Sequence, residues 1–322
     1  MWSTPRTERA DTGHPMNSRP KPGIIGTVVR GACMGAADVV PGVSGGTIAL
    51  LTGIYERFIT AAHAGAQIVG RLVRGDLRGA LVGIRSFPWS FVVPLLAGML
   101  AAVVLLAELI KDALVDHPEP MAGIFFGLVA ASALVVRRDV AWTVGRLATT
   151  LVTGAALFAG LGWQGSPSLD PPPLALFGGG LVAVCAMVLP GISGSFLLLM
   201  LGLYAAAIEV VDERLFSDAV FLAGGAVVGL TCFSSLLVRL LGRWPDDVMA
   251  AMIGLLLGSL RVLWPWPHGV GVVSRHTEAS VSGTGLDWPK AAIDLVAPTL
   301  LAVIAATAVL GAERMMRSST EA

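Results

Sequence analysis

Charge is what this sequence lacks most. Of its 322 residues, 14% are Asp, Glu, Lys or Arg, whereas 55% are hydrophobic. A soluble domain carries about 25% charged residues, so the composition predicts an integral membrane protein. Apolar runs of membrane-spanning length recur from residue 24 almost to the C-terminus, as expected of helices rather than barrel strands. The formal net charge is zero, which argues against nucleic acid as a partner.

Signals for metals, cofactors and catalysis are also scarce. The three cysteines lie in apolar runs without metal-ligand spacing, and the five histidines fall in loops or near predicted helix ends without a zinc pattern. No Walker A sequence is present to serve an ATP-driven motor. The sequence therefore predicts no metal, no cofactor and no enzyme constellation.

A repeated motif stands out instead. Pro41-Gly42-Val43-Ser44-Gly45 returns 149 residues later as Pro190-Gly191-Ile192-Ser193-Gly194, and Gly53-Ile54-Tyr55 returns as Gly202-Leu203-Tyr204 at the same offset. A second echo relates Pro118, Gly127-Leu128 and Ser132 to Pro245, Gly254-Leu255 and Ser259 at an offset of 127. Two sets of matched spacings predict an internal duplication.

Each Pro-Gly break interrupts an apolar run and predicts a helical hairpin, over residues 24–62 and again over 174–211. Arg and Lys flank the first hairpin on both sides, at positions 6, 9, 19 and 21 before it and 71, 74, 78 and 85 after it. By the positive-inside rule both flanks are cytoplasmic, so the hairpin begins and ends on one side. Its length leaves open whether it crosses the membrane fully or re-enters.

Three predicted spans follow each hairpin, at 87–110, 121–136 and 141–163 and then at 221–241, 248–264 and 292–310. Repeat 1 covers 23–165 and repeat 2 covers 166–312, between a disordered cytoplasmic tail at 1–22 and a cytoplasmic tail at 313–322. Three crossings are an odd number, so the halves insert in opposite senses. The predicted fold is an all-α polytopic membrane protein with inverted-topology repeats, as in many secondary transporters.

The two breaks supply the candidate substrate-binding residues. Serine is a favoured N-cap, and Ser44 and Ser193 each precede the second helix of a hairpin. A helix start offers free N–H groups and partial positive charge to an anion such as phosphate. The alternative is that Pro-Gly merely turns the chain and serine satisfies its own helix. The candidates at the breaks are Gly42, Ser44, Gly45, Gly46, Thr47, Gly191, Ser193, Gly194 and Ser195.

Asp38 is a charge inside the first apolar run, three residues before the break. Charges within membrane segments mark functional sites, so Asp38 is interpreted as a substrate-site or proton-linked group, or else as a satisfied structural acid. Its counterpart at the 149 offset is Met187, so the duplication itself does not require an acid.

Arginines give three further candidates. Arg30 is a headgroup contact or a residue snorkelling to the interface, and Arg261 contacts an anion from the outer side or likewise snorkels. Glu56 and Arg57, at the exit of the first hairpin, form a self-neutralising interfacial pair or gate the cytoplasmic mouth.

The two motifs resemble the signatures of a bacterial and archaeal membrane family described as polyprenyl-phosphate transporters. Met34–Thr47, continuing to Gly53–Glu56, is similar to the main signature, and Met187–Ser195, continuing to Gly202–Tyr204, to the second. The likeness covers roughly residues 26–311. It implies a plasma-membrane flippase that returns undecaprenyl phosphate, or a related lipid, to the cytoplasmic leaflet and so recycles the lipid carrier of cell-wall precursors. The resemblance implies nothing about the structure or role of residues 264–289.

Two alternatives stay open. Broken helices serve a transporter of a small soluble anion or ion equally well. Pro-Gly-x-Ser also resembles the Pro-Gly-x-Ser-Arg-Ser motif of undecaprenyl-pyrophosphate phosphatases, but Gly45 and Gly194 stand where that motif has Arg, and no acidic pair precedes either break. A phosphatase without these groups lacks the means to stabilise transferred charge. The sequence leaves the oligomeric state and the coupling ion open.

Overall fold

The structure, a computed structural model, describes residues 23–40, 43–162, 168, 171–212, 216–266 and 286–321. Within these residues the regular secondary structure is helical and contains no strand, which confirms the predicted all-α fold. Four helical segments are long and apolar enough to cross a membrane: Trp89–Asp116, Pro118–Asp139, Phe216–Arg243 and Ala292–Met315. The first is α5 (Trp89–Asp116), the second contains α6 (Pro118–Val136), the third is α11 (Phe216–Arg243), and the fourth lies mostly in α13 (Val296–Glu321).

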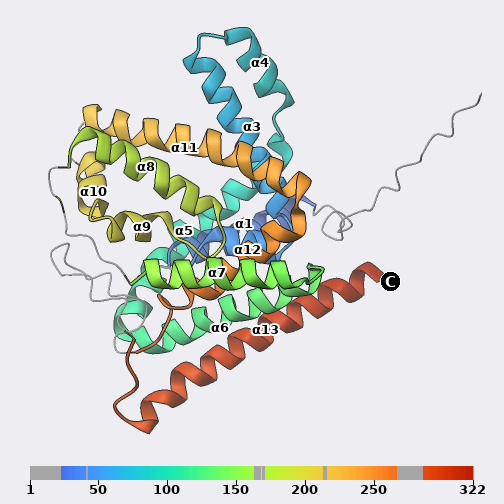
Figure 1. Cartoon of the computed structure of the whole chain (residues 1–322), viewed down its shortest axis with the longest axis vertical. Helices are drawn as coiled ribbons and strands as arrows, with labels where there is room; N and C mark the ends of the chain where they lie inside the picture. Colours follow the sequence, from blue (N-terminus) through green and yellow to red (C-terminus); the bar gives the residue numbers. More distant parts are fainter. Residues whose placement is uncertain are drawn as a thin grey trace, which may run out of the picture.

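The first predicted hairpin comprises three helices: α1 (Ile24–Asp38), α2 (Gly45–Leu51) and α3 (Tyr55–Val73). The single helix expected after the break is divided because Gly53 has a φ of 71°, a left-handed conformation that ends α2. The basic stretch after α3 forms a further helix, α4 (Leu77–Ser86). Figure 1 shows α3 and α4 protruding together from the other helices.

The second predicted hairpin is divided in the same way. It contains α8 (Pro173–Val188), α9 (Gly194–Met200) and α10 (Tyr204–Asp212), and Gly202 between the last two has a φ of 73°. The repeated Gly-(Ile/Leu)-Tyr sequence therefore marks a second helix break in each half. In contrast to α3, the matching helix α10 is short, and the described chain resumes directly with α11 at Phe216, without a described counterpart of α4.

Four long helix pairs form the body of the protein. Helix α1 packs along α5, and α8 packs along α11; α6 packs along α13, and α12 (Pro245–Ser259) along α7 (Val144–Gly160) (Figure 1). Gly31 in α1 faces the backbone of Leu95 so closely that a Cβ there would clash, and Gly180 in α8 faces Leu222 likewise. Small residues that let backbones approach are how helices associate in lipid, where no hydrophobic effect drives them together.

The ends of the chain differ from the predicted ranges. Helix α12 ends at Ser259, before the predicted 264, and α13 runs to Glu321 through the stretch predicted as a C-terminal tail. Short 3₁₀ segments, η2 (Arg137–Asp139) and η3 (Ala292–Leu295), lie beside α6 and α13. The predicted N-terminal tail and residues 267–285 of the Trp/Pro-rich stretch lie outside the described residues.

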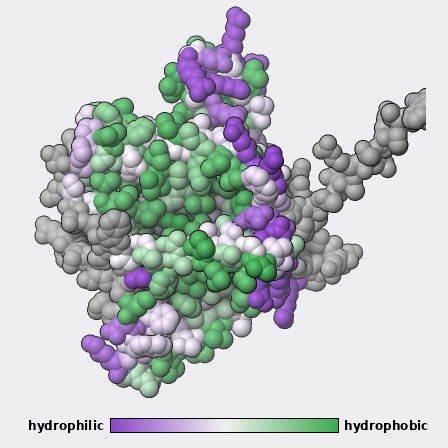
Figure 2. Space-filling view, in the orientation of Figure 1, coloured by the Kyte–Doolittle hydropathy of each residue, from purple (hydrophilic) through white to green (hydrophobic). Residues whose placement is uncertain are grey.

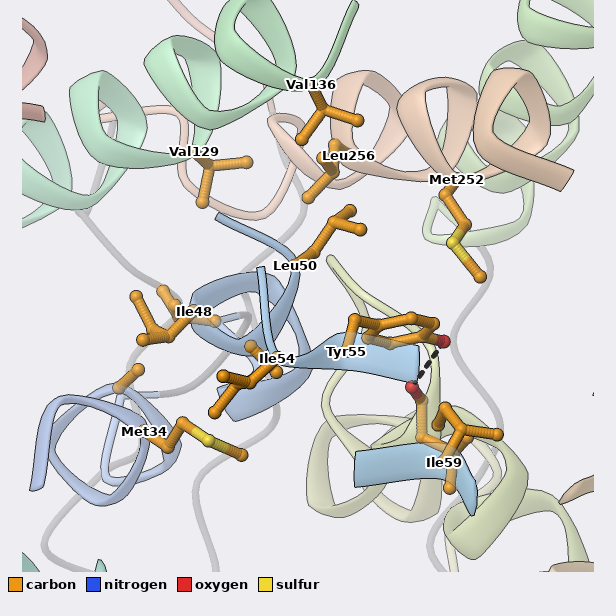
Figure 3. Close-up of a cluster of buried hydrophobic side chains, with 14 of the residues drawn as sticks. Met34, Ile48, Leu50, Ile54, Tyr55, Ile59, Val129, Val136, Met252 and Leu256 are labelled. Atoms are coloured by element: carbon orange, nitrogen blue, oxygen red, sulfur yellow. Dashed lines mark hydrogen bonds between the residues drawn. The ribbon is translucent and has the colours of Figure 1, made fainter. Parts of the chain in front are cut away.

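The buried core surrounds the two breaks. Figure 3 shows Met34 and Tyr55 from the first half together with Leu256 from the second, and Tyr55 and Leu256 have no exposed surface.

The outer surface of the protein is also largely apolar. Val104 in α5 is 79% exposed, and hydrophobic residues dominate the face in Figure 2, whereas polar residues gather at the α3–α4 end and along one edge. A protein with an apolar exterior on long helices fits a lipid surround.

Candidate functional site

The two breaks meet at the centre of the molecule. The Ser44 hydroxyl donates to the carbonyl of Leu189 at 3.2 Å, and the backbone N–H of Gly191 donates to Thr47 Oγ1 at 2.9 Å. Residues separated by more than 140 positions in the sequence thus share hydrogen bonds. The two repeated motifs are therefore in contact and form one candidate site rather than two.

Tyr55 adds a third link between the halves. Its hydroxyl donates to the Val188 carbonyl at 3.0 Å, and the side chain is fully buried (Figure 3). Backbone groups at a helix break lack helical partners, and leaving one unsatisfied inside a membrane costs several kcal/mol. Hydroxyl groups of the first motif therefore satisfy backbone groups of the second break.

The first helix start is closed by its own side chains. Gly45 N–H donates to Asp38 Oδ1 at 2.6 Å, and Gly46 N–H donates to Ser44 Oγ at 3.1 Å. A Cβ at Gly45 would lie 2.8 Å from Asp38 Oδ2, so a larger residue would displace the carboxylate. Ser44 thus satisfies its own helix, and Asp38 occupies the position where we expected a bound anion.

The second helix start is capped differently. Ser193 precedes α9 but its side chain makes no capping hydrogen bond to the backbone of that helix; its Oγ instead lies 2.9 Å from Ser195 Oγ in the first turn. Gly194 is buried and packs against the Ala183 carbonyl. Met187, at the position equivalent to Asp38, is 55% exposed. The second start therefore has two hydroxyl groups beside it, and no carboxylate within the described part of the chain is hydrogen-bonded to it.

Arg30 and Arg261, also predicted to bind substrate, make contacts away from the two breaks. Arg30 Nη1 donates to the Gly26 carbonyl at 3.0 Å, one turn back along α1. Arg261 Nη1 donates to the Phe158 carbonyl at 3.2 Å, with its guanidinium 4.8 Å from the centre of that ring. These bonds fix both side chains to neighbouring helix backbone, and neither bond reaches the two breaks.

Arg57 is held by an aromatic ring. Its Cζ lies 4.2 Å from the centroid of the Phe91 ring, a cation–π geometry. Among the described residues it forms no ion pair, either with Glu56 or with another carboxylate. The arginines at 138 and 146, in contrast, pair with Glu313 and with Asp246 and Asp247. Gly42, also predicted, lies outside the described residues.

Two polar contacts, those of His63 and Tyr55, were not predicted from the sequence. His63, expected near a helix end, lies inside α3, with Nδ1 3.3 Å from Ser234 Oγ and 3.2 Å from Ser235 Oγ, and Nε2 2.9 Å from Gln67 Nε2. The signal was a His and a Gln four residues apart in an apolar run, which share one helix face. Tyr55 was used as a marker of the repeat, and its link to the second break has no local sequence signal.

The geometry defines a polytopic α-helical membrane protein whose two interrupted helices join at its centre. The chain belongs to the VCA0040-like family, described as undecaprenyl phosphate translocase-like, whose profile matches residues 34–281. This match covers both Pro-Gly-x-Ser-Gly motifs and confirms the family expected from them.

Two relatives agree with this assignment. The chain is 37% identical over 243 residues to a polyprenyl-phosphate transporter of Vibrio cholerae serotype O1, covering 75% of this chain and 78% of the relative. It is 32% identical over 260 residues to a polyprenyl-phosphate transporter of Staphylococcus aureus, covering 74% and 85%. No solved structure gives a significant match.

Proposed function

We propose that this protein carries a polyprenyl phosphate, of the undecaprenyl phosphate type, from the outer to the cytoplasmic leaflet of the cell membrane, returning the carrier for reuse in envelope synthesis. The observation that carries the proposal is that both motifs of a polyprenyl-phosphate transporter family form a single site, joined by the Ser44–Leu189 and Thr47–Gly191 hydrogen bonds.

The helix packing supports an inverted repeat. The pairs α1–α5 and α8–α11 are equivalent under the duplication, as are α6–α13 and α12–α7. Gly31 and Gly180, which allow the close approach in the first two pairs, stand 149 residues apart, and their partners Gly98 and Gly225 stand 127 apart. Both numbers equal the offsets of the repeated motifs. Rocking of one repeat against the other then alternates access to a central site.

The two helix starts have different roles in the proposed transport cycle. Phosphate enters from the outer side at the second break, beside Ser193 and Ser195, to which no carboxylate of the described residues is hydrogen-bonded. It then passes to the first break, where it must displace Asp38 from the Gly45 N–H. Protonation of Asp38 removes the competing negative charge, so entry of a proton and release of the helix start are linked. Transport is therefore proton-coupled.

Reconstitution tests the proposed substrate. The full chain is placed in liposomes with labelled undecaprenyl phosphate in one leaflet, and arrival in the other leaflet is measured. Protein-dependent movement supports the proposal. Movement of inorganic phosphate in place of the lipid would establish a small-anion transporter, and release of inorganic phosphate from undecaprenyl pyrophosphate would establish a phosphatase.

Single cysteines test the inverted repeat. In a background without Cys33, Cys185 and Cys232, cysteines at positions 20 and 78 are expected to react with an impermeant maleimide from the cytoplasmic side, and one at position 280 from the outside. Any other pattern contradicts opposite insertion of the two halves.

A further inference from the structure

A hydrocarbon-lined cavity of about 230 Å³ lies between α3, α5 and α11. Its walls are built from Ala, Gly, Val, Leu and Phe residues, and none of the described residues that line it is polar or charged. The floor is deeply buried, since Phe91 and Leu95 are 0% and 2% exposed, whereas the rim residues Val69 and Leu96 are 38% and 48% exposed. The cavity thus leads from the lipid-facing surface into the protein.

A positively charged side chain packs against the wall of this cavity. The Arg57 guanidinium lies over Phe91, one of the lining residues, at 4.2 Å from the ring centroid. Among the described residues no carboxylate neutralises it. An unpaired charge within a membrane protein is costly and indicates a functional partner, and a guanidinium is well suited to phosphate.

The cavity is connected to the central site through α3. Arg57 is two residues from Tyr55, whose hydroxyl bonds to Val188 in the second break. Phe58, next to Arg57, lines the cavity and packs against the core that includes Tyr55. An occupant of the cavity with an anionic end at Arg57 therefore lies beside the segment that joins the two breaks.

We propose that this cavity receives the phosphate-proximal isoprenoid units of a polyprenyl phosphate while Arg57 contacts the phosphate. In that lipid the phosphate is joined directly to hydrocarbon, which matches a cation placed directly on an apolar wall. A phospholipid separates its phosphate from its acyl chains by glycerol esters, and the cavity wall offers those polar groups no hydrogen-bond partner. The volume is below the ~300–1,000 Å³ of pockets that enclose whole ligands, so the distal chain leaves past Val69 and Leu96 into lipid.

A matched pair of substitutions in one helix tests the cavity. A Cβ at Gly65 would sit 3.6 Å from the Phe87 ring, inside the cavity, whereas a Cβ at Gly70 would meet nothing within 4 Å. Both glycines lie in α3, so Gly65→Leu and Gly70→Leu change its helix propensity equally. We expect Gly65→Leu to slow movement of undecaprenyl phosphate in liposomes about tenfold and Gly70→Leu less than about twofold.

This inference rests on the proposed function, and the two fail differently. If the unmodified protein moves no undecaprenyl phosphate, the proposed function is wrong. If it does, and Gly65→Leu is as active as Gly70→Leu, the transport function stands and the cavity is not where the chain binds.

Photo-crosslinking identifies the occupant. Farnesyl phosphate with a diazirine in its first isoprene unit is expected to label residues 58–69 and 87–96 in the full-length protein, and undecaprenyl phosphate is expected to suppress the labelling. Equal suppression by phosphatidylglycerol would make the cavity a general acyl-chain site and overturn the proposal, as would labelling confined to other segments.

The charge is tested separately. Arg57→Gln is expected to weaken this labelling about tenfold, while Arg78→Gln, which removes an equal charge from α4, changes it less than about twofold. Equal effects of the two substitutions would show that net charge, rather than a contact at Arg57, attracts the probe.

Discussion

The two breaks share a motif but differ in what surrounds their helix starts. At the first, the Asp38 carboxylate and the Ser44 hydroxyl both accept from the start of α2. At the second, Ser193 leaves the start of α9 without a side-chain cap, and Met187 replaces the acid. One sequence pattern thus supports a closed, anionic start and an open, neutral one.

The links between the breaks are also unequal. Ser44, Thr47 and Tyr55 of the first segment all bond to the backbone of residues 188–191. At the equivalent positions of the second segment stand Ser193, Phe196 and Tyr204, and no described hydrogen bond runs from their side chains to the first break. The first repeat therefore holds the second break in place.

The largest effect is expected from the acid. Asp38→Asn keeps an oxygen that accepts from Gly45 N–H but cannot take up a proton, so the proposed linkage between proton entry and release of the helix start is lost. We expect undecaprenyl phosphate movement in liposomes to fall about tenfold and to lose its response to an imposed pH gradient.

The control for the acid is Met187→Asn at the equivalent position, which is expected to change transport less than about twofold. If Asp38→Asn keeps the response to the pH gradient, Asp38 is a structural cap, and the coupling group lies elsewhere.

Thr47→Val tests the link from the first repeat to the second break. The substitution preserves shape but leaves the buried Gly191 N–H without its acceptor, at a cost of ~1–3 kcal/mol in the free energy of unfolding. Thr52→Val is the matched control, because the Thr52 hydroxyl bonds to the Ile48 carbonyl of its own helix. Denaturation in mixed micelles measures both. Equal losses would show that the effect belongs to any threonine of this segment and not to the contact between the halves.

Much of this fold followed from the sequence. Apolar length predicted the membrane helices, and the repeated Pro-Gly-x-Ser-Gly predicted both breaks, because proline, glycine and serine act locally on the backbone. The expected serine cap is found at Ser44 but not at Ser193. The additional helix ends at Gly53 and Gly202 were not predicted. An isolated glycine in an apolar run is compatible with a continuous helix, and its left-handed conformation is fixed by the surrounding fold.

The sequence identified the residues at the two breaks but not how they are arranged. Ser44, Thr47 and Gly191 were each identified, but that they bond to one another depends on how α2 packs against the second break. The cavity beside Arg57 depends on three helices from both halves. Such contacts have no local signature, since they are set by helix packing across more than 100 residues of sequence.

The two N-cap serines are expected to differ in stability. Ser44→Ala removes the acceptor for Gly46 N–H and the donor to Leu189, which costs about 1 kcal/mol. Ser193→Ala removes no helix cap and is expected to cost less than about 0.5 kcal/mol. Its effect is expected in transport instead, because it removes a hydroxyl from the open start. Equal stability losses in micelle denaturation would show that the two starts are capped alike.

The smallest effect is expected at Tyr55 and Tyr204, which occupy equivalent positions shortly after Gly53 and Gly202. Tyr55→Phe removes the donor to the buried Val188 carbonyl, and a carbonyl tolerates loss of one partner better than an N–H does, so we expect ~0.5–1 kcal/mol. Tyr204 has no described hydrogen bond from its hydroxyl, so Tyr204→Phe is expected to be neutral within about 0.3 kcal/mol. Because the substitutions are chemically identical, their difference in unfolding free energy isolates the contact between the halves. A zero difference would mean that the first repeat does not hold the second break through Tyr55.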